Sequence, residues 1–390
     1  MRSILGGKGA GLAEMTNLGI RVPPGFTIST EVCGFYYRHR AAYPGPLKEE
    51  VERALETVQS LMGQRFGDAK NPLLVSVRSG AVFSMPGMMD TVLNVGLNRS
   101  TLEGLVTRGG GGVEARRFAL DCYRRLIDMF ACVVRGVGHS GFADKLAAAR
   151  ARAGVEHDHE LSVEDLGGVI EAYLEIYENE VGEVFPEDPT VQLWGAIDAV
   201  FESWNGARAV TYRRLHGIPH DLGTAVNVQA MVFGNMGPGC ATGVAFTRDP
   251  ASGEPEFYGE FLPNAQGEDV VAGIRTPQVI RRGLGDPTLS SFEEAFPECY
   301  RELLEVRGRL EDHFGDMQDI EFTVENGRLF LLQTRRGQRT GLAALRIACD
   351  MVEEGLIEEP AAVRQVRPEG LVQLLAPTFS ADGLAAARGL

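Results

Sequence analysis

The feature that most constrains the fold is the dipeptide Asn326-Gly327, which stands between two short runs of alternating apolar and polar residues. Asn-Gly in this setting is the strongest short-range signal for a two-residue hairpin turn. The sequence therefore predicts an antiparallel hairpin within residues 316–340. Its first strand opens with Asp319 and Glu321, and their spacing of two places both carboxylates on the same face of the strand.

The second strand of this predicted hairpin ends in a polar cluster, Gln333, Thr334, Arg335 and Arg336. One interpretation is a solvated sheet face whose charges are loosely balanced. The other is a site for a metal ion and a phosphate chain, because carboxylates bind metal ions and guanidinium groups bind phosphates. The hairpin alone does not choose between these interpretations.

The register of the hairpin leaves one detail open. In an ideal two-residue hairpin Glu325 pairs with Arg328, which places Thr334 rather than Gln333 on the face that carries Asp319. Either a bulge shifts the register, or Gln333 acts from elsewhere. Glu325→Gln, beside the turn, is expected to have little effect on function.

Length and charge limit the class of protein. A chain of 390 residues exceeds the usual size of a single core, so two or three structural units are expected. The net charge of -15 argues against nucleic acid or an anionic membrane as a partner. No apolar run approaches the roughly 20 residues that cross a bilayer. The six scattered cysteines form no C-x-x-C pair and indicate reduced thiols of a cytoplasmic protein.

Phosphate-binding signals are dispersed, because the chain has neither a Walker A sequence nor a G-x-G-x-x-G motif. Gly6-Gly7-Lys8-Gly9 places a lysine in a glycine loop ahead of a predicted helix, where backbone N–H groups favour anions. Arg78 ends a predicted buried strand and is followed by Ser79-Gly80. Taken singly, a flexible turn and a structural ion pair explain these residues equally well.

Two further glycine-bearing segments fit the same theme. The run "GNMGPGCATGVAFTRDP", which contains Thr242, is predicted to form a hairpin that closes over a triphosphate and donates backbone N–H groups to it, although a mobile surface hairpin has the same composition. The turn "NAQGEDVVAG" carries Glu268 and Asp269 ahead of the start of an apolar strand.

Taken together, these segments resemble the N-terminal nucleotide-binding domain of the pyruvate, phosphate dikinase family, a relative of the ATP-grasp enzymes. The resemblance covers nearly the whole chain in the family's order, through "GGKGAGLAEM", "LLVSVRSG", "SMPGMMDTVLNVGLN", "GTAVNVQAMVFGN", "GVAFTRDPASGE", "NAQGEDVVAGIRTPQ" and "DMQDIEFTVENGRLFLLQTR". The piece "SMPGMMDT" distinguishes the chain from the related phosphoenolpyruvate synthases.

The resemblance implies an α+β fold, ATP-grasp-like and two-lobed, with a helical insertion subdomain and ATP in the cleft between the lobes. The first lobe is expected to comprise residues 1–110 with 190–240, and the second lobe residues 241–340. The insertion is expected over residues 111–189. Residues 341–390 are expected to form a helix and a linker toward a phosphohistidine domain.

The resemblance also implies the site residues. Those in catalytic positions are Arg78, Glu321 and Arg335. Those that bind ATP are Lys8, Arg78, Gln229, Met231, Thr242, Gly243, Glu268, Asp319, Gln333 and Arg335. Those that hold the metal, Mg²⁺, are Asp319, Glu321 and Gln333.

The implied reaction is ATP + pyruvate + phosphate going to AMP + phosphoenolpyruvate + diphosphate, through a histidine on a separate domain that serves as partner. His139, in "GVGHSGF", lacks the glycine-rich setting of that carrier, so neither the carrier nor a pyruvate site is expected here. Relatives carry a further strand before the glycine loop, and full-length relatives are expected to dimerise through a C-terminal part that this chain lacks. The rival interpretations are a stand-alone, non-catalytic nucleotide-binding or regulatory module and a related dikinase such as phosphoenolpyruvate synthase.

Overall fold

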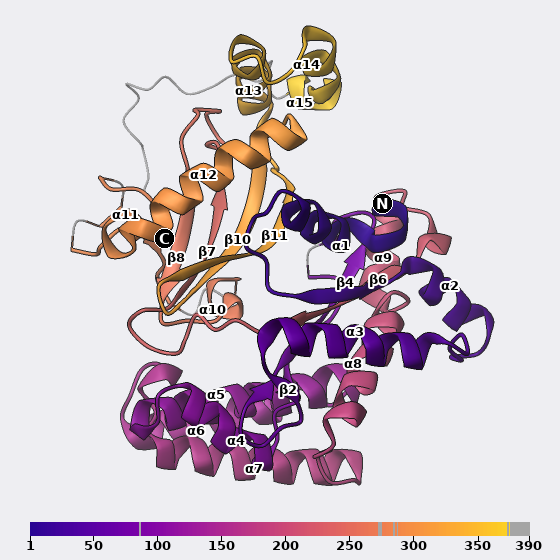
Figure 1. Ribbon diagram of the computed structural model, residues 1–390, viewed down its shortest axis with the longest axis vertical. Coiled ribbons are helices and arrows are strands. Elements are labelled where there is room, and N and C mark those ends of the chain that lie inside the picture. Colours follow the sequence, from indigo (N-terminus) through magenta and orange to yellow (C-terminus); the bar gives the residue numbers. More distant parts are fainter. Residues whose placement is uncertain (86, 272–274, 284, 287, 373, 375–390) are drawn as a thin grey trace, which may run out of the picture. The chain divides into compact units, whose positions relative to one another are not determined.

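The computed structural model describes residues 1–85, 87–271, 275–283, 285–286, 288–372 and 374. It is a mixed α+β structure, as expected, and it divides into two compact units (Figure 1). Unit 1 comprises Met1–Thr242, Pro263–Ala272 and Phe322–Thr334, and unit 2 comprises Gly243–Leu262, Gly273–Glu321 and Arg335–Leu390. The linker expected at the end of the chain falls largely outside the described residues, as does Pro86 of the "SMPGMMDT" segment.

Unit 1 contains a four-stranded sheet, a two-stranded sheet and most of the helices. Its strands are β1 (Gly25–Ile28), β2 (Arg65–Phe66), β3 (Pro72–Leu73), β4 (Val75–Ala81), β5 (Thr91–Val95) and β6 (Thr224–Ala230). Its α-helices are α1 (Arg2–Asn17), α2 (Thr30–Arg38), α3 (Leu47–Met62), α4 (Arg99–Arg108), α5 (Gly112–Met129), α6 (Ser140–Ala153), α7 (Val163–Val181), α8 (Pro189–Ser203), α9 (Ala207–Leu215) and α10 (Gly267–Val271). Shorter turns are η1, a π-helix (Phe130–Val134), and the 3₁₀ helices η2 (Asp158–Glu160) and η3 (His220–Leu222).

The four-stranded sheet is antiparallel, in the order β1-β6-β4-β5. Every residue of β6 and all but one of β4 are buried, because helices α1, α2 and α8 contact these central strands. One face of the sheet is nevertheless polar. Ser76 lies opposite Gln229 and Arg78 lies opposite Asn227, so these four side chains share one face. We call this group the polar sheet face.

The helical part of unit 1 consists of α4, α5, α6 and α7 (Figure 1). Helix α4 contacts α5, α5 contacts α7, and α7 contacts α6. Their shared core is apolar and includes Phe118, Leu126, Phe142 and Tyr173. The sequence predicts a helical stretch from about Glu114 to Trp204, broken near "HSGFADK" and "VEHDHE". Both breaks are confirmed, because η1 is separated from α6 and α6 is separated from α7.

The second sheet has the order β11-β10-β7-β8-β9. Its strands are β7 (Ala241–Phe246), β8 (Tyr258–Pro263), β9 (Gln278–Val279), β10 (Gln318–Glu325) and β11 (Arg328–Arg336). The predicted hairpin is confirmed, because β10 and β11 are neighbours joined by a two-residue turn. Asn326 and Gly327 have φ values of 50° and 73°, the left-handed region that a type I′ turn requires.

The glycine-rich run between β6 and β7 is not a hairpin. β6 pairs with β1 and β4, whereas β7 lies between β10 and β8 in the other sheet. The sequence could not show this, because glycine content marks a turn but does not identify the strands that pair across it.

The helices of unit 2 are α11 (Phe292–Ala295), α12 (Pro297–Phe314), α13 (Gly341–Glu353), α14 (Glu359–Gln365) and α15 (Pro368–Val372). The sequence "SFEEAFPECYRELLEVRGRLEDHF" predicts one long helix before the hairpin. The structure divides it at Phe296, whose φ of -135° is not helical. The cause is Pro297, since a proline disfavours the helical conformation at the residue before it.

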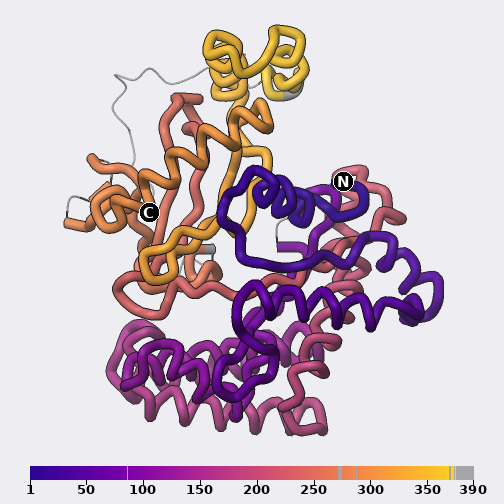
Figure 2. Tube along the Cα trace, viewed as in Figure 1, coloured from indigo at the N-terminus to yellow at the C-terminus, as the bar shows by residue number. Residues whose placement is uncertain are grey.

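Helix α13 packs against α14 and α15 in unit 2 (Figure 2). The inner side of α13 joins Met317 in a small apolar core with Ala343, Ile347 and Met351. Among the described residues, no helix combines the length and apolarity needed to cross a bilayer.

Candidate functional site

The glycine segment at the start of the chain packs tightly on β4. Helix α1 is broken at Gly6, whose φ of 67° starts a new helical segment at Gly7. A Cβ atom on Gly6 would lie 1.6 Å from the carbonyl oxygen of Gly80, so only glycine fits there. Lys8 therefore lies in the first turn of this second segment rather than in a loop ahead of the helix, and its Cβ lies beside Gly80.

The same helix covers the polar sheet face. A Cβ atom on Gly9 would lie 2.9 Å from both Asn227 Oδ1 and Thr27 Oγ1. Because glycine allows this approach, the N–H groups at the start of the segment, Lys8 and the polar sheet face lie close together in unit 1. Such a group of donors at a helix start is suited to an anion.

Arg78 and Gln229 are joined directly. Arg78 has only 8% of its surface exposed, and its Nη2 donates to Gln229 Oε1 and, at 3.4 Å, to the carbonyl oxygen of Leu332. Gln229 Nε2 donates to the carbonyl oxygen of Pro23 at 3.0 Å. Met231 follows directly after β6 and is buried, and its N–H donates to the carbonyl oxygen of Leu74. Gln333, next to Leu332 on β11, is also buried.

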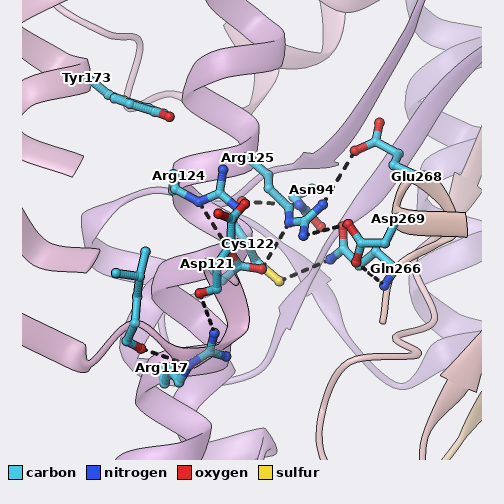
Figure 3. A network of polar contacts seen from close by, with 12 residues as sticks. Asn94, Arg117, Asp121, Cys122, Arg124, Arg125, Tyr173, Gln266, Glu268 and Asp269 are labelled. Carbon is cyan, nitrogen blue, oxygen red and sulfur yellow. Dashed lines mark hydrogen bonds and ion pairs between the residues drawn. The ribbon is translucent and has the colours of Figure 1, made fainter. Parts of the chain in front are cut away.

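Glu268 belongs to a second polar cluster of unit 1, at the start of α10 (Figure 3). Its carboxylate lies 3.8 Å from Arg125, and the same guanidinium donates to Asp269 and Asp121 at 2.9 Å each. Desolvation by burial raises the pKa of Glu268, and Arg125 only partly opposes it. Desolvation acts in the same direction on Asp121, but there Arg125 and Arg124 outweigh it and hold the pKa of Asp121 below its usual range.

Thr242 lies near this second cluster. Its hydroxyl donates to the carbonyl oxygen of Phe322 at 3.3 Å, and a Cβ atom on Gly267 would lie 3.8 Å from Thr242 Oγ1. Thr242 therefore lies close to the residue that precedes Glu268. Gly243, the next residue of β7, is buried.

In unit 2, Asp319 and Arg335 form an ion pair of 2.7 Å. Asp319 is 7% exposed, and Glu321 is partly buried. Desolvation raises the pKa of Asp319; Arg335 lowers it, and the neighbouring Glu321 raises it further. Two carboxylates close enough to disfavour each other's charge are suited to a cation.

A bulge in β11 creates the pairing of Asp319 with Arg335. The N–H of Gly337 donates to the carbonyl oxygen of Met317, so these two residues are partners across the hairpin. Counted from the Glu325–Arg328 pair beside the turn, Met317 lies eight positions away along β10, whereas Gly337 lies nine positions away along β11. The extra residue in β11 shifts the register by one. Arg335, rather than the Thr334 of an ideal hairpin, therefore lies beside Asp319.

The structure thus distributes the predicted site residues over three groups. Lys8, Arg78, Gln229 and Met231 lie at or beside the polar sheet face, and Gln333 follows the Leu332 carbonyl that Arg78 reaches. The other two groups are Thr242 with Glu268 in unit 1, and Asp319 with Glu321 and Arg335 on β10 and β11 of unit 2.

Arg125 was not among the predicted site residues; it connects α5 to α10, the short helix, rather than the start of a strand, that carries Glu268 and Asp269. Asp121 and Arg125 at i and i+4 were a visible signal for a helical ion pair. Nothing in the sequence indicated that the same guanidinium also reaches Asp269, 144 positions along the chain.

Comparison with known proteins shows one family. The profile described as "Pyruvate phosphate dikinase, AMP/ATP-binding domain" matches residues 2–42, 39–291 and 287–356. A pyruvate, phosphate dikinase of Rhizobium meliloti (strain 1021) is 54% identical over 381 residues, 97% of this chain and 42% of the relative. The Clostridium symbiosum protein of the same name is 49% identical over 387 residues, 99% of this chain and 43% of the relative.

A chloroplastic pyruvate, phosphate dikinase of Mesembryanthemum crystallinum is 51% identical over 379 residues, which is 97% of this chain and 38% of the relative. The chain therefore spans about two fifths of the length of these relatives.

Proposed function

The chain belongs to the family of pyruvate phosphate dikinase AMP/ATP-binding domains, and from this premise we propose that it binds ATP with Mg²⁺ and donates the two terminal phosphates to a histidine on a separate domain. In the transfer, the bond between the β-phosphorus and the oxygen that bridges to the α-phosphate breaks. A bond from the β-phosphorus to the histidine nitrogen forms, and AMP leaves. Pyruvate and phosphate would react elsewhere in the complete enzyme.

One observation carries the proposal more than any other: the close packing of the Gly6–Gly9 segment on β4. It places a helix start and Lys8 beside Gly80, two residues from the buried Arg78. Helix N-terminal N–H groups, a lysine and an arginine fork are the groups that bind a phosphate chain. Phosphoryl transfer is catalysed mainly by such positioning and charge neutralisation.

The side chains proposed as metal ligands have the donor atoms that Mg²⁺ prefers. The proposed set, Asp319, Glu321 and Gln333, offers carboxylate and amide oxygens, the hard ligands that Mg²⁺ prefers. Bound Mg²⁺ would neutralise charge on the transferred phosphates. Arg335 then has two roles in the proposal: its ion pair orients Asp319, and its partly exposed guanidinium is placed to contact phosphate oxygens.

The remaining assignments belong to the same proposal. Gln229, Met231, Thr242, Gly243 and Glu268 would bind the rest of the nucleotide, with Arg125 holding α10, which carries Glu268, in position. The fold would be of the ATP-grasp type. Residues 1–110 with 190–240 would form its first lobe, 111–189 its helical insertion and 241–340 its second lobe.

The first prediction is that MgATP raises the melting temperature of the isolated chain. A ligand at 100 times its dissociation constant stabilises a protein by about 2.7 kcal/mol, which thermal denaturation detects readily. ATP with a chelator should give a much smaller shift, and pyruvate should give none. Absence of a shift with saturating MgATP would contradict the proposal, provided that circular dichroism shows a folded protein.

The second prediction concerns the phosphate-binding cations. Lys8→Ala should weaken MgATP binding by about 10- to 100-fold, since a hydrogen bond to a charged group contributes about 1.5–3 kcal/mol. Arg78→Lys should also weaken it, because lysine keeps the charge but loses the planar fork. Isothermal titration measures both. Lys70→Ala, at an exposed lysine of the same unit, is the matched control and should bind normally. Equal MgATP affinities in all variants would show that the phosphates do not bind at the start of α1.

A further inference from the structure

A separate cluster of side chains that can bind a metal ion, Asp128, Cys132 and His139, lies at the end of α5. The proposed ATP site does not use it. The helix continues from Met129 into the π-helical turn η1, in which the N–H of Arg135 donates to the carbonyl oxygen of Phe130. Gly136, with φ of 68°, then reverses the chain. This reversal brings His139, at the start of α6, back to the side chains of Asp128 and Cys132.

The possible ligand atoms of the three side chains lie close to one another. Asp128 Oδ1 lies 3.0 Å from His139 Nδ1 and 3.4 Å from Cys132 Sγ, and the sulfur lies 3.9 Å from the same histidine nitrogen. Single turns of π-helix inside α-helices occur frequently at functional sites. Here the wide turn follows Asp128 and contains Cys132, so it belongs to the construction of the cluster.

These distances match a metal-binding geometry. Tetrahedral zinc has ligand bonds of about 2.0–2.3 Å, which separate neighbouring ligand atoms by about 3.3–3.6 Å. The three observed separations of 3.0, 3.4 and 3.9 Å bracket this interval. Shifts of a few tenths of an ångström would therefore equalise them around an ion.

The chemistry of the donors selects the class of ion. A thiolate and an imidazole favour zinc and similar transition metals, whereas Mg²⁺ prefers oxygen ligands. The side chain of Asp128 is 18% exposed and that of His139 is 67% exposed, so the cluster is shielded on one side and open to solvent on the other. An ion could enter from solvent, and water could take the fourth position.

We propose that Asp128, Cys132 and His139 form a binding site for a zinc-class transition-metal ion, with three protein ligands and one position open to water. The ion would bind as the thiol proton of Cys132 is released to solvent, and no other bond changes. It would link the end of α5 to the start of α6 across the turn at Gly136. This site is separate from the proposed Mg²⁺ ligands, which lie on β10 and β11.

The experiment uses the full chain after removal of metals with a chelator, and Co²⁺ as the probe. Wild-type protein should bind one Co²⁺ with an absorption band from charge transfer between thiolate and cobalt, and with the intense visible bands of a tetrahedral site. Stoichiometric Zn²⁺ should remove these bands, and excess Mg²⁺ should not. Absence of the charge-transfer band would overturn the proposal.

Substitutions identify the ligands. Cys132→Ser should abolish the charge-transfer band, and Cys132→Ser and His139→Ala should each weaken Zn²⁺ binding by more than about a hundredfold, since even loss of a residue that merely orients a ligand costs about 10- to 100-fold. His159→Ala, at an exposed histidine, and Cys349→Ser, at an exposed cysteine, are the controls and should keep full affinity.

Two outcomes would show that the cluster is only a set of hydrogen bonds. In the first, the metal remains bound with unchanged affinity in Cys132→Ser. In the second, His139→Ala lowers the stability of the metal-free protein but the wild type binds no ion. The MgATP-induced rise in melting temperature should be the same in the wild type and in both ligand variants. A failure of the metal site is therefore distinguishable from a failure of the proposed ATP site.

Discussion

Replacement of Arg125 by methionine is expected to destabilise unit 1 by about 3–5 kcal/mol, the usual effect of removing one partner from a buried charge network. Methionine keeps much of the length of the side chain but removes the guanidinium that contacts Asp121, Asp269 and Glu268. Asp269 and Glu268 would then stay near one another without that cation, while Asp121 would keep Arg124. Urea denaturation measures the loss.

Tryptophan fluorescence makes this measurement specific for unit 1, because the two tryptophans of the chain, Trp194 and Trp204, both belong to it. Arg116→Met is the matched control on the same helix. Arg116 pairs with Glu103 at 2.9 Å, but both side chains are largely exposed, so its loss should cost at most about 1 kcal/mol. Equal urea midpoints for Arg125→Met and Arg116→Met would show that the contacts of Arg125 contribute no net stability.

The effect of Arg125→Met should depend on pH. The arginines hold the pKa of Asp121 below its unfolded value of about 4, so the ionised carboxylate favours the folded state. This contribution is present above about pH 4 and is lost as the pH falls through the lower folded pKa. The difference in stability between wild type and variant should therefore be largest near neutral pH and should shrink in acid. Urea midpoints across this range test the sign.

The second large effect is expected for Glu321→Gln in turnover. When a separate phosphohistidine domain is supplied, AMP formation should fall by at least about a hundredfold, the usual effect of losing one group that stabilises developing charge. Affinity for MgATP should change by less than about fivefold, because a metal ligand contributes more when charge redistributes in transfer than when the nucleotide docks. Single-turnover AMP release and isothermal titration separate the two quantities.

The control for this experiment comes from the structure. Glu325→Gln, beside the turn, is expected to do little to turnover, but the contacts of Glu325 make it a poor control, because its loss would also affect stability. Its carboxylate pairs with Arg108 at 2.8 Å with 12% of the side chain exposed, and it also accepts the N–H of Phe233. Glu305→Gln on the exposed side of α12 is the better control and should leave turnover unchanged. Equal, mild effects at Glu321 and Glu305 would support the interpretation of a solvated sheet face.

Several features could be predicted from the sequence because short segments determine them. The turn at Asn326-Gly327 follows from two residues that accept positive φ. The division between α11 and α12 also has a local cause, because Pro297 disfavours the helical conformation at Phe296. The prediction of one long helix there was wrong because it left this proline out of account. Family membership also came from the sequence, because several motifs in a fixed order are a strong signal when combined.

Other features depended on tertiary structure. The glycine-rich run after β6 was recognisable as a turn, yet the strands on either side of it joined different sheets. The contacts of Arg125 with Asp269, and of Gly6 with Gly80, join segments that are distant in the chain. No local pattern encodes such pairs, because they follow from how helices pack on sheets.

The hairpin at Asn326-Gly327 shows both kinds of information in one element. The sequence by itself determined the turn and the placement of Asp319 and Glu321 on one face, because both follow from the conformations of neighbouring residues. Only the tertiary structure determined which residue lies opposite Asp319. One extra residue in β11 shifts the register and places Arg335 there. A bulge depends on how the strand pairs along its length, and that pairing is set by packing against the rest of the sheet rather than by the turn.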